Sequence, residues 1–94
     1  MSLEMTGRER QIQKIEERTG ELAKEILLNE SAIYETEKEI GKIEEDILDH
    51  PLILNYIQSL KILIERITKK NELYKAEIFE NELKIKQLKG NDQG

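Results

Sequence analysis

Apolar side chains recur at spacings of three and four residues along nearly the whole of this 94-residue chain. When heptad position a is placed at Ile12, eight of the eleven a and d positions through Ile47 are aliphatic. When a is placed at Ile57, nine of the eleven a and d positions between Ile53 and Leu88 are apolar. This repeat is typical of helices that bury their a and d side chains against each other in a coiled-coil seam. The sequence therefore predicts an all-α fold of two long helices.

The two heptad frames are out of step by three residues, and the slip falls at Asp49-His50-Pro51. Proline disfavours helical angles in the residue before it, yet it is well suited to the first position of a helix. Asp49 or His50 is then placed to cap the second helix. We expect helices over about 7–48 and 51–89, folded back at the turn 49–51 into an antiparallel hairpin. A single kinked rod is the alternative.

A reversal at residue 50 pairs seam residues whose numbers sum to 100. The polar seam residues then meet one another, because Asn29 faces Asn71 and Thr19 faces Asn81, and only Thr36 faces an aliphatic residue. Two facing asparagines can satisfy each other's hydrogen bonds and fix the register at some cost in stability. We predict that these two pairs set the register of the hairpin.

The charges beside the seam also favour a hairpin. The first 50 residues carry 14 acidic and 7 basic side chains, whereas the remaining 44 carry 6 and 8. In an antiparallel pair, e positions face e positions and g positions face g positions, so Arg18 can meet Glu77 and Glu25 can meet Lys70. At the e positions, Glu16, Glu30, Glu37 and Glu44 lie opposite Lys61, Lys75 and Lys89.

Both helices carry apolar residues that the seam does not use. A helix that is apolar on more than one face is usually buried on more than one face, and a large exposed apolar patch marks an interaction surface. We expect self-association, most simply a homodimer that forms a four-helix bundle, and a role as a small adaptor, scaffold or regulator that binds protein. The expected interface residues are Leu27, Tyr34, Leu52, Tyr56, Ile62, Leu63, Leu73 and Phe79.

Residues that could support catalysis or bind a metal are sparse. The chain has no cysteine and one histidine, and it contains neither a nucleophile motif nor a glycine-rich phosphate loop. Asp46, Asp49 and His50 could hold a divalent cation at the turn, but helix capping is the commoner role of such residues. We therefore expect no enzymatic activity, no metal, no cofactor and no small-molecule substrate. No run of 18 apolar residues occurs, so we expect no membrane-spanning helix.

A second functional hypothesis rests on acidic charge. The net charge of −5 opposes binding to nucleic acid, which needs a basic surface. Acidic residues gather before the turn at Glu35, Glu37, Glu39, Glu44, Glu45, Asp46 and Asp49. Such a stretch could mimic a phosphate backbone toward a basic partner, so an acidic inhibitor of a nucleic-acid-binding protein is the alternative. High salt should weaken that binding and spare an apolar contact.

The ends of the chain are polar. We expect residues 1–6 to be disordered or to derive from cloning, residues 90–94 to form a disordered tail, and the protein to be cytoplasmic. The segments Glu21–Ile26 and His50–Tyr56 resemble parts of small helical regulators of the YlbF/YmcA type, with a different spacing between them. No function is carried over from this resemblance. The composition is similar to that of small bacterial and phage proteins.

Overall fold

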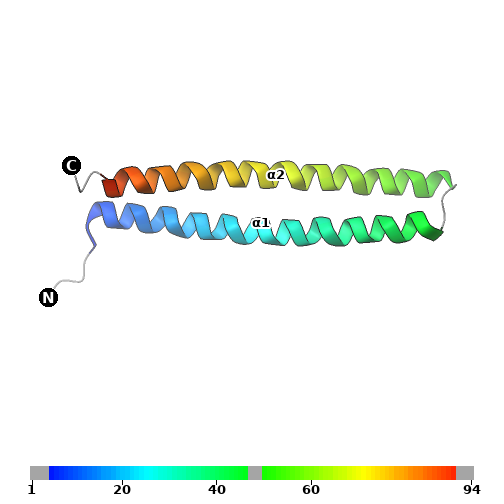
Figure 1. The fold of residues 1–94 in the computed structure, drawn as a ribbon, viewed down its shortest axis with the longest axis horizontal. Coiled ribbons are helices and arrows are strands. Elements are labelled where there is room, and N and C mark those ends of the chain that lie inside the picture. Colours follow the sequence, from blue (N-terminus) through cyan, green and yellow to red (C-terminus); the bar gives the residue numbers. More distant parts are fainter. Residues whose placement is uncertain (1–4, 47–49, 91–94) are drawn as a thin grey trace.

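The chain folds into two antiparallel helices. The computed structural model describes residues 5–46 and 50–90, in which α1 spans Gly7–Asp46 and α2 spans Pro51–Gly90. The helices lie side by side along their whole length, so that the start of α1 and the end of α2 lie at one end of the molecule (Figure 1). The molecule measures 70 × 26 × 15 Å. The predicted all-α hairpin of two helices is confirmed.

Both helices begin at a side-chain cap. At α1, Thr6 Oγ1 accepts a hydrogen bond of 3.1 Å from the backbone N–H of Glu9. At α2, His50 Nδ1 accepts one of 3.2 Å from the N–H of Leu52, while the His50 carbonyl accepts from Leu54 at 3.0 Å. His50 thus occupies the cap position before a proline at the first helical position.

Some boundary predictions lie outside the described residues. These are the end of the first helix at residues 47–48, the second candidate cap Asp49, and most of the two terminal segments. Met5 and Thr6, from the predicted N-terminal extension, are described and exposed, and α2 continues one residue beyond its predicted end. Helix ends commonly differ by one or two residues between assignments.

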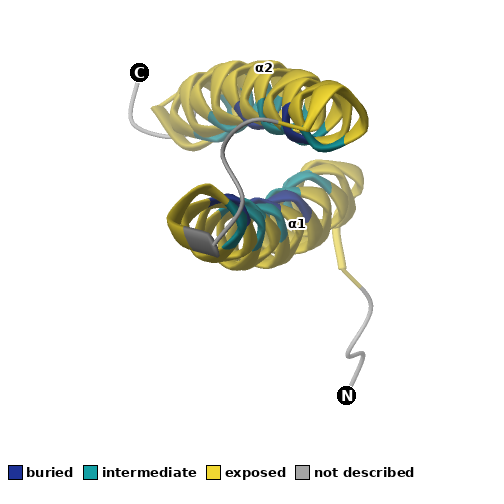
Figure 2. Ribbon diagram, turned by 90° about the vertical axis from the view of Figure 1, so that its right-hand side faces the viewer, coloured by how far each residue is buried: buried dark blue, intermediate teal, exposed yellow. Residues whose placement is uncertain are grey.

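The seam is the core of this fold. Every described a and d side chain is buried or half-buried, and Glu77 is the one other described residue that is not exposed. Figure 2 shows these residues on the facing sides of the two helices, with exposed residues around them. Because two helices cannot enclose a seam completely, only Leu22, Ile26, Ile40, Ile57 and Asn71 are buried among the described residues.

Polar side chains contact one another inside the seam. Asn29 Nδ2 donates a hydrogen bond of 2.7 Å to Asn71 Oδ1, and Asn71 Nδ2 donates to the Ile26 carbonyl at 3.3 Å. Asn81 Nδ2 donates to Thr19 Oγ1 at 3.4 Å. The two contacts between side chains join residues whose numbers sum to 100. That the pairs set the register stays a prediction.

Thr36, the unpaired polar seam residue, is satisfied within its own helix. Its Oγ1 donates a hydrogen bond of 2.7 Å to the backbone carbonyl of Ala32, one turn earlier. The hydroxyl therefore needs no partner across the seam, and the methyl group is left to face the aliphatic side.

Only part of the predicted charge pairing is present. Arg18 Nε donates to Glu77 Oε2 at 2.9 Å, which joins the two helices at g positions. Among the described residues, the predicted Glu25–Lys70 pair and the predicted glutamate–lysine pairs at the e positions are not formed. Those predictions were wrong because long, solvent-exposed side chains gain little from one fixed geometry.

Candidate interaction surface

The cross-seam contacts define two flanks of the rod. Arg18 contacts Glu77, and the Tyr56 hydroxyl donates a hydrogen bond of 2.8 Å to Glu39 Oε1. All four residues occupy g positions. Since g and c positions lie on one side of a helical seam and e and b positions on the other, the hairpin has two flanks. We call the g and c side the Tyr56 flank and the e and b side the Tyr34 flank.

The pKa shifts on the Tyr56 flank arise from neighbouring side chains. The hydrogen bond from Tyr56 to Glu39, together with the negative charge of that carboxylate, raises the pKa of the Tyr56 phenol above its ordinary value. The hydrogen bond from Arg18 to Glu77 likewise raises the pKa of the Arg18 guanidinium. Each shift follows from one partner at the surface, so neither group has the shared, desolvated environment of a catalytic pair.

The Tyr56 flank is divided along its length. Its g and c positions near the termini, before residue 28 of α1 and after residue 73 of α2, carry only charged and amide side chains. Toward the turn the flank carries apolar residues among charged ones, which include Glu35, Glu39, Lys42, Arg66 and Lys70. Its exposed apolar residues are Leu28, Ala32, Leu52, Tyr56, Leu63 and Leu73. All of them lie in the half toward the turn, which we call the apolar half of this flank.

The Tyr34 flank carries scattered apolar residues. They are Ala23, Leu27, Tyr34, Leu54 and Phe79, set among polar side chains, mostly glutamates and lysines, and the glycines Gly20 and Gly41. The ammonium of Lys38 lies 5.6 Å from the centre of the Tyr34 ring, a cation–π contact that covers part of the ring.

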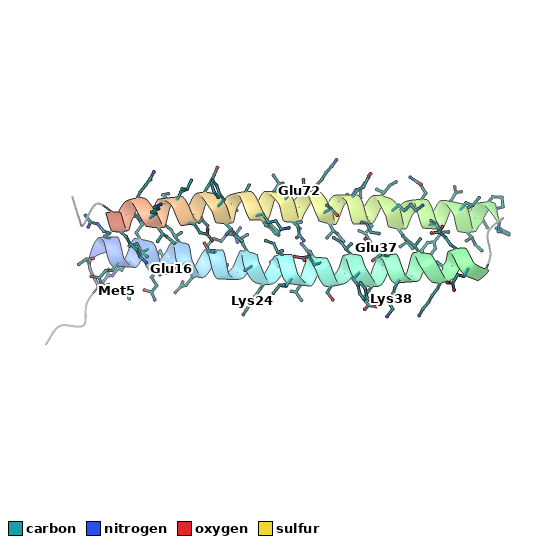
Figure 3. The ribbon with its side chains drawn as sticks, in the orientation of Figure 1. Met5, Glu16, Lys24, Glu37, Lys38 and Glu72 are labelled. Carbon is teal, nitrogen blue, oxygen red and sulfur yellow. The ribbon has the colours of Figure 1, made fainter. Side chains whose placement is uncertain are left out.

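The backs of the two helices differ. In α1 the described f positions are all polar, and Figure 3 shows the labelled Lys24 and Lys38 pointing away from α2. In α2 the f positions include Ile62, Ala76 and Leu83. The outer side of α1 therefore offers nothing for an apolar contact.

The predicted interface residues are all exposed but do not form one stripe. Their side chains are 40% to 71% exposed. Leu52, Tyr56, Leu63 and Leu73 lie on the Tyr56 flank, Leu27, Tyr34 and Phe79 on the Tyr34 flank, and Ile62 on the back of α2. The residues were predicted as one surface, although their heptad positions in an antiparallel hairpin already divide them between two flanks and the back of α2. Sequence reasoning missed Leu28 and Ala32, although their c and g positions were readable from the heptad.

The other candidate sites are described only in part. Among the described residues, no three acidic or histidine side chains come close enough to share a metal ion. Asp49 and the side chain of Asp46, which belong to the candidate site at the turn, lie outside the described residues. The described acidic residues before the turn point in several directions, since Glu35, Glu37, Glu39, Glu44 and Glu45 occupy c, e, g, e and f positions. Neither α1 nor α2, as described, has an apolar stretch that could cross a membrane.

Neither a protein-family model, nor a curated protein, nor a solved structure matches this chain. The resemblance to helical regulators therefore gains no support.

Proposed function

We propose that this protein is a non-catalytic protein-interaction module, an adaptor, scaffold or regulator that binds protein through exposed apolar side chains of the hairpin. The observation that carries the proposal is the exposure of large apolar residues in a fold with so small a core. Leu52, Leu73 and Leu27 are each at least two-thirds exposed. Single exposed leucines are common, but a rod carrying many of them gains by covering them.

Self-association is the simplest way to cover these residues. A two-fold dimer turns two hairpins into a four-helix bundle, in which helix flanks that face water in the monomer face another helix. The aromatic residues Tyr34, Tyr56 and Phe79 are the expected anchors, because aromatic side chains contribute most to typical interfaces.

Affinity capture at two salt concentrations tests this proposal. The full chain is immobilised, and proteins from its source cells are retained at about 0.15 M and about 1 M salt. We expect the retained set, including untagged copies of the chain, to persist at high salt and to be lost with Leu52→Ser/Leu63→Ser/Leu73→Ser. The matched control is Lys61→Ser/Lys69→Ser/Lys75→Ser, which alters three exposed polar positions of the same helix.

Two results would contradict the proposal. Retention at low salt alone would favour the acidic-inhibitor hypothesis, since screening weakens charge contacts. Retention unchanged both by the leucine substitutions and by Leu27→Ser/Tyr34→Ser/Phe79→Ser would place binding elsewhere than on the exposed apolar side chains.

A further inference from the structure

We propose that the apolar half of the Tyr56 flank binds a second copy of this chain, with α1 of each copy packed against α2 of the other. This inference rests on the proposed function, since both attribute protein binding to exposed apolar side chains. It adds the partner, the flank and the arrangement of the two copies.

The surface area of the hairpin is larger than its mass requires. The chain exposes 7663 Å², whereas a compact monomer of 11.0 kDa exposes about 5,600 Å². A standard interface removes about 800 Å² from each partner. The hairpin therefore exposes roughly 2,000 Å² more than a compact monomer of its mass. This excess is larger than the area that each partner loses in a standard interface.

The apolar residues of the Tyr56 flank are self-complementary. The Asn29–Asn71 contact fixes the relative height of the helices, so Leu28, next to Asn29, lies level with Leu73, two residues past Asn71. Both are at c positions, 64% and 70% exposed. A two-fold axis parallel to the rod places α1 of the second copy opposite α2 of the first. Every residue keeps its height along the rod. Leu28 of each copy then meets Leu73 of the other, so the contact forms twice.

One pair of facing g residues in the middle of this flank is apolar as well. Tyr56 contacts Glu39 and Arg18 contacts Glu77, so g residues facing across the seam have numbers that sum to 95. By the same rule Leu63 faces Ala32, the one small residue among the described g positions of α1. This pair lies between the row of c residues that contains Leu28 and the row that contains Leu73. Because Ala32 is small, the pair leaves room for an opposing helix to approach.

Charge selects the orientation of the second copy. One heptad from Leu28 and Leu73 toward the turn, the same c columns carry Glu35 and Arg66. The axis parallel to the rod places Glu35 of each copy opposite Arg66 of the other. An axis perpendicular to the rod would instead lay α1 on α1, and α1 belongs to the half of the chain with 14 acidic and 7 basic residues. Like charges along the contact oppose that arrangement.

The Tyr34 flank does not suit a second copy in the same way. On this flank, a two-fold axis parallel to the rod would bring Leu27 opposite Glu72 and Tyr34 opposite Glu65. The two residues of each pair are at b positions and at the same height along the rod. Placing a carboxylate against an apolar side chain removes its water without supplying a partner. The two flanks therefore differ in how well they match themselves.

Two adjacent leucines give a matched test. Leu27 and Leu28 are 67% and 64% exposed but lie on opposite flanks, so serine at either position should leave the hairpin folded. Sedimentation equilibrium of the full chain over a range of concentrations should give twice 11.0 kDa for the wild type. We expect Leu28→Ser to raise the dimer dissociation constant at least about tenfold. Leu27→Ser should change it by less than about twofold. Circular dichroism confirms that helix content is retained.

A charge swap tests the arrangement. Arg66→Glu should weaken the dimer by creating two contacts between like charges, and Glu35→Arg combined with Arg66→Glu should restore it. Lys69→Glu makes the same charge change at an f position and should leave the dimer intact. A swap that fails to restore dimerisation overturns the proposed arrangement.

Two further outcomes overturn the inference. One is a monomer at every concentration, and the other is a Leu27→Ser variant that dissociates as readily as Leu28→Ser. The proposed function is decided separately by affinity capture. A monomeric chain whose capture of other proteins is lost with the leucine substitutions would refute the dimer and support the interaction module.

Discussion

At the residue scale, Asn71 combines burial with two satisfied hydrogen bonds. Its side chain is 5% exposed, its Oδ1 accepts from Asn29, and its Nδ2 donates to the Ile26 carbonyl. The contact reaches one side chain and one backbone group of α1, three residues apart. A shift of one heptad would break both bonds and leave a buried amide without partners, which is how a polar pair enforces register.

The asparagine pair predicts opposite effects for single and double substitutions. Asn71→Leu leaves the Asn29 amide without its acceptor inside the seam, and we expect it to lower the free energy of unfolding by about 1–3 kcal/mol. Asn29→Leu combined with Asn71→Leu removes both amides and should raise the melting temperature above that of the wild type. The same double variant should populate more than one register or oligomer, because the more buried of the two polar pairs that penalise a shift is then absent. Urea denaturation and light scattering measure the two effects.

Thr36→Ile is the control for this pair. It also replaces a polar seam residue by an aliphatic one, but Thr36 bonds only to its own helix. It should raise stability and leave a single species in solution. A double asparagine variant less stable than Asn71→Leu alone would contradict our account of the pair.

Tyr56 predicts a pH dependence at the alkaline end. Its pKa is raised in the folded chain, first by the hydrogen bond to Glu39 and then by the charge of that carboxylate. A group whose pKa is higher in the folded state stabilises the fold below its unfolded pKa, here about 10, and loses this contribution as the pH rises through the folded pKa. Tyrosinate absorbance of the wild type minus that of Tyr56→Phe should therefore show a midpoint above pH 10.

Glu39→Gln tests whether the Glu39 carboxylate causes the raised pKa of Tyr56. Removing the carboxylate should move the Tyr56 midpoint to lower pH, whereas Glu37→Gln, two residues away on the other flank, should leave it in place. A midpoint that is insensitive to Glu39→Gln would show that the hydrogen bond does not persist in solution.

At the element scale, α1 contains two glycines that its packing does not require. Gly20 and Gly41 lie inside the helix with no positive φ, and a Cβ on either would meet no atom within 4 Å. Glycine in a helix interior costs about 1 kcal/mol relative to alanine. We expect Gly20→Ala and Gly41→Ala each to raise the free energy of unfolding by up to about 1 kcal/mol, and additively, since they are six turns apart.

Urea denaturation checks the glycine prediction, with Ala23→Gly as a control of opposite sign. Both glycines are at b positions of the Tyr34 flank, so the substitutions should leave dimerisation through the Tyr56 flank unchanged. A loss of dimer with Gly20→Ala would show instead that a partner approaches this flank closely.

The elements of this fold could be predicted from the sequence, whereas the surface could be predicted only in part. The seam and the turn are encoded by the heptad pattern and by Pro51, and burial enforces both. Asp49 and His50 are both competent caps, so pattern alone could not choose between them. Exposed pairs such as Glu25 and Lys70 have little energy at stake, so the sequence pattern does not tell which of them form.

At the scale of the whole molecule, the shape follows from two helices of equal length. Each has 40 residues, and they enclose one seam and no broader core. A rod of 70 Å with a radius of gyration of 21.0 Å exposes both flanks along its full length. A second hairpin can therefore cover a flank without a conformational change. The overall dimensions of the dimer then report whether the two rods lie side by side or end to end.

Small-angle scattering should distinguish side-by-side from end-to-end association. Two rods packed at a helix spacing of 8–10 Å double the mass but raise the radius of gyration from 21.0 Å by only about 0.5 Å. Two rods joined end to end would have a radius of gyration of about 40 Å, roughly twice that of the monomer, because 70 Å then separates their centres. We expect the dimer to keep the maximum dimension of the monomer. Leu28→Ser should halve the mass at nearly constant radius of gyration, because the hairpin itself stays folded. A dimer whose length grows with its mass would place the contact at the ends of the rod and exclude packing along the Tyr56 flank.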